Sequence, residues 1–292
     1  SVCNLFTIFR QYAANIPWSK IIAMQHSMQQ VSIALAQVNF KVGDIDGNLE
    51  KINTAILDAK TQFMSSQTEG GNGKHNNELM VVFSELALIG YPPEDLLLRP
   101  SLQHRVEKGL QQIAEMSKDV AIVMGYPWQQ GDKLFNMAGV WSNGEQIAQY
   151  AKRFLPNYQV FDEQRYFTVG DQPCVFEWQG HKIGLTICED IWNLPTGQTG
   201  VGNENPLYKI CPLDILIEQK PDFILNLSAS PFTYKQAETR KEIVSANAKR
   251  YGIPLFYANH VGAQTELIFD GGSLAANSKG EIVAELPYFE TL

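Results

Sequence analysis

Cysteine is scarce in this chain, and long apolar runs are missing. Only four cysteines occur in 292 residues, namely Cys3, Cys174, Cys188 and Cys211. They form neither a CxxC pair nor a Cys/His pattern, so we expect no metal site, and a chain of this length with so few cysteines is not a disulfide scaffold. No stretch of about 18 consecutive apolar residues is present, so no transmembrane helix is expected.

Basic residues are outnumbered by acidic ones and do not cluster. The chain has 23 Lys and Arg against 31 Asp and Glu, a formal net charge of -8. Binding to nucleic-acid phosphates needs a basic face, so this balance argues against a nucleic-acid partner. The N-terminal stretch is interrupted by Arg10 and Lys20 and lacks the layout of a signal peptide. We therefore expect a cytoplasmic protein with no membrane partner.

Several catalytic signatures are also missing. The five histidines lie mostly in polar or helical segments and no G-x-S-x-G string occurs, which argues against a Ser-His-Asp triad. We expect His260, which follows a predicted strand, to serve packing or hydrogen bonding. No P-loop string is present, and the pair Gly271-Gly272 lacks the third glycine of a dinucleotide fingerprint.

The chain does contain enough apolar sequence for a large core. Hydrophobic residues make up 45% of it and charged residues 18%, which fits one large domain or two small ones. The first convincing strand begins at Val31. Residues 1–28 are therefore predicted to be an N-terminal extension, with Met28 as a possible alternative start, and residues 29–292 a single globular domain.

Strands and helices alternate along this domain, with a hairpin among them. Helices are predicted over 48–62, where apolar residues recur at helical spacing, and over 101–118 and 234–251. The pair Asn143-Gly144 predicts a hairpin turn, and residues 68–77 are predicted to be a loop. Strands are predicted at 31–38, 79–83, 120–124, 136–141, 146–150, 174–178, 182–187, 223–227, 255–259 and 272–276. This mixture favours an α/β sandwich with mixed sheets over a doubly wound sheet.

Cys188 stands where a predicted buried strand ends, a position where α/β folds gather function. The strand 182–187 runs directly into it, and a nucleophile at a sharp strand-to-helix turn is exposed on a rigid backbone. Helix N-terminal N–H groups are expected to lower the thiol pKa and to act as oxyanion donors. The alternative is a structural cysteine, since a lone Cys often packs as a small apolar residue.

Glu85 and Lys152 follow two other predicted strands. A carboxyl buried after the apolar strand 79–83 has a raised pKa, and Glu85 could then act as a general base near neutral pH. Lys152 follows the second strand of the hairpin and could stabilise an anionic tetrahedral intermediate. Taken singly, each is more often a structural or surface residue.

In this order and context, the three residues resemble the Glu-Lys-Cys triad of the nitrilase superfamily, and the resemblance covers the chain from about Val31 onward. It implies a four-layer αββα sandwich with two mixed sheets. It implies that Glu85 takes the proton of Cys188 and that the thiolate attacks an amide carbonyl. Lys152 and a backbone N–H at the turn after the nucleophile would hold the oxyanion.

Longer strings resemble the glutaminase domain of glutamine-dependent NAD+ synthetases. They are residues 85–97 (ELALIGYPPEDLL), 152–167 (KRFLPNYQVFDEQRYF), 188–192 (CEDIW) and 259–273 (NHVGAQTELIFDGGS). The resemblance implies that glutamine is held by Tyr91, Tyr158, Phe161 and Glu189, and that Glu163 supports the lysine. A further substrate contact is expected from Ser228 or Ser230, and the sequence leaves open which one.

Some features depart from the synthetase pattern. It predicts Gly and Asp where the chain has Ala263 and Thr265, which leaves the shape of that loop open. Residues 195–206 are a Gly/Asn-rich segment, either a lid or a surface insertion. The S-G-G-x-D-S loop of the family's ATP-using domain does not occur in the chain. We expect no cofactor for the glutaminase reaction, ATP and Mg²⁺ belonging to a partner synthetase domain, and a homo-oligomer.

The sequence thus predicts a domain that hydrolyses glutamine to glutamate and ammonia through a Cys188 thioester. The ammonia would amidate nicotinate adenine dinucleotide to NAD+. Two alternatives stay open: a stand-alone nitrilase-type amidase acting on another small amide, and a non-catalytic interaction module with the same fold.

Overall fold

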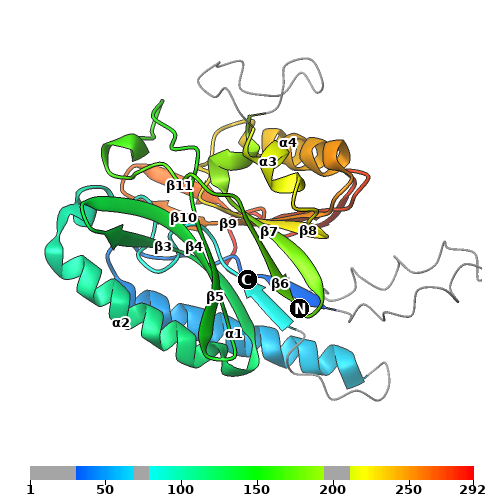
Figure 1. Ribbon diagram of the computed structural model, residues 1–292, viewed down its shortest axis with the longest axis horizontal. Helices are drawn as coiled ribbons and strands as arrows, with labels where there is room; N and C mark the ends of the chain where they lie inside the picture. Colours follow the sequence, from blue (N-terminus) through cyan, green and yellow to red (C-terminus); the bar gives the residue numbers. More distant parts are fainter. Residues whose placement is uncertain (1–30, 69–78, 194–210) are drawn as a thin grey trace, which may run out of the picture.

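The computed structural model describes residues 31–68, 79–193 and 211–292, and within them the chain forms four layers: helices, sheet, sheet, helices (Figure 1). The predicted extension 1–28, the segment 195–206 and nearly all of the predicted loop 68–77 lie outside the described residues. In the part of the chain that is described, no helix is long and apolar enough to cross a membrane.

The first sheet has five strands in the order β1-β2-β3-β4-β5. Strands β1 to β3 are parallel and β4 and β5 continue antiparallel, so the sheet is mixed. Its strands are β1 Ser32–Leu35, β2 Leu79–Val82, β3 Ala121–Gln130, β4 Lys133–Ser142 and β5 Glu145–Ala151. Helices α1 (Ile45–Thr68) and α2 (Pro100–Met116) cover its outer face (Figure 1).

The second sheet has the order β13-β12-β9-β8-β7-β6 and is also mixed, since only β7, β8 and β9 are parallel. Helices α3 (Pro212–Ile217) and α4 (Gln236–Tyr251) lie on its outer face (Figure 1). Its strands are β6 Cys174–Trp178, β7 His181–Ile187, β8 Phe223–Ser228, β9 Leu255–Asn259, β12 Leu274–Ala276 and β13 Ile282–Glu285, and a separate hairpin comprises β10 Val261–Gln264 and β11 Leu267–Asp270. Short 3₁₀ helices are η3 Glu94–Leu98, η4 Ser117–Asp119, η5 Glu163–Arg165 and η6 Cys188–Ile191.

Burial of both faces explains the continuous apolar runs of the central strands. In β2, Leu79 and Val81 lie in the core shared with α1 and α2, whereas Met80 and Val82 lie in the core between the sheets. In β8, Ile224 belongs to the third core, under α3 and α4. A strand that is dry on both sides shows no polar alternation, so its sequence reads as one apolar run.

The four layers with two mixed sheets confirm the predicted fold class, and the strands 174–178 and 255–259 have the predicted bounds. The prediction that the third strand ends at 124 is wrong, because β3 continues to Gln130 and pairs with β4 along its length. Pro127 is tolerated there because it lies beyond the last residue of β3 that pairs with β2. The hairpin β10–β11, strand β13 and helix α3 were not predicted.

Candidate active site

The ends of three strands bring Glu85, Lys152 and Cys188 into one buried cluster. Glu85 lies in the turn after β2, Lys152 follows β5, and Cys188 begins η6 directly after β7. Lys152 Nζ lies 2.6 Å from Glu85 Oε1, and the Cys188 thiol interacts electrostatically with both side chains. The three residues that the sequence singled out therefore meet, although two come from one sheet and the third from the other.

The backbone at Cys188 is strained. Its φ is 41°, in the left-handed region that residues with a Cβ seldom adopt. Strain of this kind costs about 1–3 kcal/mol and persists only where the surroundings enforce it. One such contact is the amide of Asn226, which donates to the Cys188 carbonyl at 3.5 Å. The predicted strand-to-helix turn is present, with a helix that is a single 3₁₀ turn.

The pKa of the Cys188 thiol is raised well above its ordinary value, so the prediction that helix N–H groups lower it is wrong. Burial is the largest cause, and the Glu85 carboxylate adds to it. Lys152 lowers the pKa but does not outweigh these effects, and η6 is too short to have a large dipole. The resting thiol is neutral, so attack on a substrate needs a proton acceptor.

Three donors hold the Glu85 carboxylate. Its Oε1 accepts hydrogen bonds from Lys152 Nζ and, at 2.7 Å, from Asn136 Nδ2, while Oε2 accepts the Ala229 backbone N–H at 3.0 Å. Close packing of the backbone is also required, because a Cβ on Gly125 would lie 2.1 Å from the Leu86 nitrogen. Asn136 was not predicted as a site residue; the available signal was an amide inside an otherwise apolar strand.

Glu163 is a second carboxylate bound to the lysine ammonium. Its Oε1 accepts from Lys152 Nζ at 2.8 Å and from the Tyr91 hydroxyl at 2.9 Å. The pKa of Glu163 is raised to about 7, because burial and the nearby Glu85 together outweigh the opposing effect of Lys152. For Lys152, burial lowers the pKa, but Glu163 and Glu85 outweigh burial and keep the ammonium charged.

The predicted substrate residues fall into two groups. Tyr158 donates to Glu189 Oε1 at 2.8 Å and meets the ring of Phe161 edge to face, with ring centroids 5.6 Å apart. Glu189 is itself buried next to the nucleophile. Tyr91 belongs instead to the lysine cluster, because its hydroxyl is bound to Glu163. Their roles toward a substrate stay predictions.

Two serines and a histidine complete the predicted set. Ser228 Oγ donates to Asn226 Oδ1 at 2.9 Å, whereas Ser230 is held through its backbone N–H by Asn259 Oδ1 at 2.9 Å. Both serines are buried, which leaves open which of them contacts a substrate. His260 was expected to serve packing or hydrogen bonding, and its ring packs against Phe40 and Phe269, with ring centroids 6.3 and 4.7 Å away.

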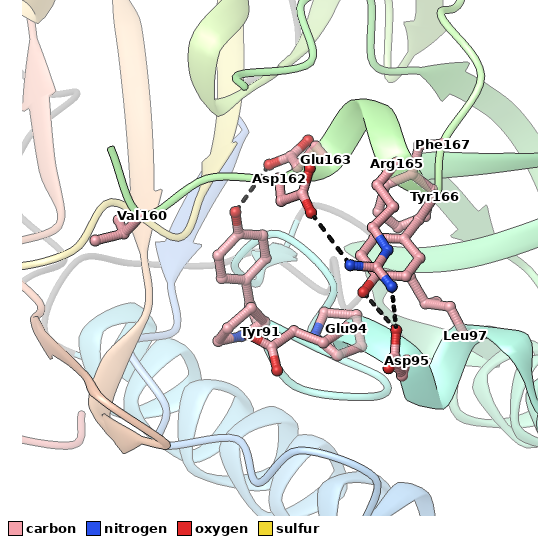
Figure 2. A pocket seen from close by; sticks show the side chains of 12 residues that line it. Tyr91, Glu94, Asp95, Leu97, Val160, Asp162, Glu163, Arg165, Tyr166 and Phe167 are labelled. Carbon is pink, nitrogen blue, oxygen red and sulfur yellow. Dashed lines mark hydrogen bonds and ion pairs between the residues drawn. The ribbon is translucent and has the colours of Figure 1, made fainter. Parts of the chain in front are cut away.

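A cavity of about 270 Å³ opens beside the cluster (Figure 2). Tyr91 and Glu163 form part of its wall. Arg165 lies between two acids that also line it, 3.6 Å from Asp95 and 3.8 Å from Asp162. Charges of both signs suit a small polar molecule rather than a hydrocarbon chain. Over residues 31–68, 79–193 and 211–292, no His, Cys, Asp and Glu cluster suited to a metal ion is found.

Comparison with known proteins identifies a family model and two similar synthetases. The carbon-nitrogen hydrolase family model matches residues 32–194, which include the three clustered residues. The chain is 40% identical over 267 residues to the glutamine-dependent NAD(+) synthetase of Synechocystis sp., covering 89% of this chain and 44% of that protein. The structure of glutamine-dependent NAD+ synthetase from Acinetobacter baumannii in complex with ADP matches with a TM-score of 0.76 at 37% identity, over 89% of this chain and 44% of that one.

A shorter protein shares the fold alone. The Nesterenkonia AN1 amidase from the nitrilase superfamily matches with a TM-score of 0.70 at 24% identity, over 91% of this chain and 89% of that one. The chain thus spans less than half the length of the synthetases it resembles and nearly all of this amidase.

Proposed function

The chain belongs to the carbon-nitrogen hydrolase family, and from that premise we propose that residues 29–292 are a glutamine amidohydrolase domain. The observation that carries the proposal is the second carboxylate beside the nucleophile. Glu189 is buried and is held by the Tyr158 hydroxyl at 2.8 Å. A buried carboxylate favours a cationic partner, and the α-amino group of glutamine supplies one.

The proposed reaction begins with a proton transfer. Because the resting thiol of Cys188 is neutral, Glu85 accepts its proton as Sγ attacks the amide carbonyl carbon. A C–S bond forms and the carbonyl oxygen becomes an oxyanion. Lys152 and a backbone N–H of the turn after Cys188 stabilise this charge, in a site where burial strengthens both interactions.

Collapse of the tetrahedral intermediate releases ammonia. The C–N bond breaks, the leaving nitrogen receives the proton held by Glu85, and a thioester to Cys188 remains. Glu85 then takes a proton from water, the resulting hydroxide attacks the thioester carbonyl, and glutamate leaves as the thiol is reprotonated. Glu163 keeps the Lys152 ammonium in place throughout.

We propose further that the ammonia amidates nicotinate adenine dinucleotide to NAD+ in a synthetase domain that uses ATP and Mg²⁺. Support comes from the relatives, which are named glutamine-dependent NAD(+) synthetases and are more than twice as long as the matched region. A cytoplasmic location and a homo-oligomeric assembly are part of the same proposal.

Substrate selectivity tests the glutaminase assignment. The measurement is kcat/KM for glutamine, asparagine and butyramide with the same enzyme preparation. Asparagine is one methylene shorter, so with its amino group at Glu189 the amide carbon falls short of the sulfur, and misplacement by about 1 Å can cost 10²-fold in rate. Butyramide has no amino group, so it cannot make the proposed contact with Glu189 and loses the binding free energy of that contact.

We expect the order glutamine, then asparagine and butyramide, with at least a tenfold gap. Equal or better hydrolysis of butyramide would favour a stand-alone amidase instead. A thiol-reactive glutamine analogue that fails to label Cys188 would support a non-catalytic module.

A further inference from the structure

Asp190, two residues after the nucleophile, is fully buried and accepts four hydrogen bonds. Its Oδ1 accepts the backbone N–H groups of Arg153 at 3.1 Å and Phe154 at 2.9 Å. Its Oδ2 accepts the backbone N–H of Ile187 at 2.9 Å and the hydroxyl of Tyr150 at 2.8 Å. One side chain thus binds donors from two segments of the chain that are far apart in sequence.

Those two segments are the ones that carry the reactive groups. Arg153 and Phe154 directly follow Lys152 at the end of β5, in the first sheet, and Ile187 directly precedes Cys188 at the end of β7, in the second sheet. The Asp190 carboxylate is therefore a bridge between the two sheets at the point where the lysine and the thiol meet. Neither reactive side chain is hydrogen-bonded to the carboxylate, and Lys152 interacts with it only electrostatically, so Asp190 fixes the positions of both through their backbones.

We propose that Asp190 is a positioning residue that sets the separation between the Lys152 ammonium and the Cys188 sulfur. The proposal rests on the roles given to these two residues under the proposed function. Oxyanion stabilisation depends on donors lying within about 0.5 Å of their productive positions, so a bridge between the two backbones controls the rate of the acylation step.

The Asp190 bridge also helps to hold the strained backbone of Cys188. Residue 188 has φ of 41°, and the peptide unit on its N-terminal side is fixed by the Ile187–Asp190 hydrogen bond. On its C-terminal side the carbonyl is bound by Asn226. A left-handed residue relaxes when one of its anchors is lost, and the sulfur would move with it.

Only an ionised carboxylate can accept all four hydrogen bonds. The pKa of Asp190 is raised to about 6, because burial outweighs the N–H groups of Ile187 and Phe154, which lower it, and the group is mostly charged at pH 7.5. An asparagine has the same size but only one acceptor oxygen. Its amide nitrogen must face either the Ile187 N–H or the pair at Arg153 and Phe154, so one of the two ties is broken.

The test compares Asp190→Asn with a matched control, Asp222→Asn. Asp222 Oδ2 also accepts a backbone N–H of β7, that of Lys182 at 2.8 Å, but at the opposite end of the strand from Cys188. We expect Asp190→Asn to lower kcat for glutamine about 10- to 100-fold with KM changed less than about threefold, and Asp222→Asn to leave both unchanged.

A second readout does not depend on glutamine hydrolysis. Alkylation of Cys188 by iodoacetamide at pH 7.5, followed by mass spectrometry, should slow in Asp190→Asn and not in Asp222→Asn. If wild-type protein does not hydrolyse glutamine, the proposed function fails, and the alkylation rates still test the positioning role.

Tyr150→Phe covers the case in which Asp190→Asn does not fold, because it removes one of the four hydrogen bonds and keeps the ring. Its kcat should fall in the same direction by a smaller factor, about three- to tenfold. A folded Asp190→Asn with kcat and alkylation rate within twofold of wild type would overturn the proposal. So would an unfolded Asp190→Asn combined with a fully active Tyr150→Phe.

Discussion

Glu85 and Lys152 form an ion pair with an N–O distance of 2.6 Å in which neither side chain reaches solvent. Two charges taken out of water are stable only if they compensate each other and their remaining hydrogen-bonding capacity is met. Here Asn136 and the Ala229 N–H bind the carboxylate, and Glu163 binds the ammonium. The pair therefore belongs to the proposed catalytic centre and is also a site where a single substitution affects stability.

The first prediction concerns the nucleophile. Cys188→Ala should abolish glutamine hydrolysis, because it removes the thiol that forms the proposed thioester. The control is Cys211→Ala, which removes another buried free thiol and should keep full activity. In an intact synthetase, Cys188→Ala should leave NAD+ synthesis from free ammonia largely unchanged. Hydrolysis retained within about tenfold of wild type, a difference of ~1.4 kcal/mol in barrier, would contradict the assignment.

Two lysines with the same ion-pair distance allow a matched test of burial. Lys60 lies 2.6 Å from Asp119 at the surface, as Lys152 lies 2.6 Å from Glu85 in the interior. Lys152→Ala leaves Glu85 and Glu163 without a cation and should lower the free energy of unfolding by about 3–5 kcal/mol, whereas Lys60→Ala should lower it by about 1 kcal/mol or less.

Activity separates the same two variants. Lys152→Ala should lower kcat for glutamine by 10² or more, since an oxyanion donor is lost, and Lys60→Ala should not change it. Urea unfolding and steady-state kinetics give both numbers. Similar losses of stability in the two variants would show that the buried carboxylates of Glu85 and Glu163 do not depend on the lysine for charge compensation.

The candidate residues at strand ends could be predicted from the sequence because each of them directly follows a recognisable strand. Continuous apolar runs before Glu85 and Cys188 predicted strands buried on both faces, which placed both residues at strand ends. The order of Glu, Lys and Cys then supplied the family resemblance. The comparison with known proteins confirms that family over residues 32–194.

Hydrogen-bond partners that are distant in the sequence could not be predicted in the same way. Asn136 and Asp190 act through hydrogen bonds to residues 51 and up to 40 positions away, and no local pattern records such pairings. The thiol pKa was predicted with the wrong sign because the helix was visible in the sequence, while the gathering of three carboxylates, Glu85, Glu163 and Glu189, around the buried Cys188 was not.

His260 should make the stability depend on pH. The ring is fully buried, burial lowers its pKa from 6.5 to about 3, and neither ring nitrogen has a hydrogen-bond partner in the described part of the chain. The folded protein thus keeps the ring neutral, while the unfolded chain binds a proton below pH 6.5. The free energy of unfolding should therefore be highest above pH 6.5 and should decrease as the pH falls from 6.5 towards 3.

This effect should make the free energy of unfolding about 2 kcal/mol lower at pH 5 than at pH 7.5, at roughly 1.36 kcal/mol per pKa unit. His260→Phe keeps a ring between Phe40 and Phe269 and removes the titrating group. Urea unfolding gives the free energy of unfolding at pH 7.5 and at pH 5. Between these two pH values, it should decrease by about 2 kcal/mol less in His260→Phe than in wild type. The exposed His104→Gln serves as control and should follow wild type. Parallel pH profiles for wild type and His260→Phe would be inconsistent with a neutral buried ring.

The last prediction concerns Thr265, at the turn where the chain departs from the synthetase pattern. Gln264 pairs with Leu267, so Thr265 and Glu266 form a two-residue turn between β10 and β11. Thr265 has φ of 50°, which is unfavourable for a β-branched residue, whereas Asn and Asp tolerate this region better. The positive φ thus explains why Asp is expected at this position.

Thr265→Asn should raise the free energy of unfolding by about 0.5–1 kcal/mol. Glu266→Asn should not, because Glu266, its neighbour in the turn, has no positive φ. Both side chains are exposed, so neither substitution alters core packing. The test is the urea unfolding midpoint of each variant. Equal gains in stability would point to a general effect of Asn in the turn. A loss of stability in Thr265→Asn would mean that the threonine is not strained.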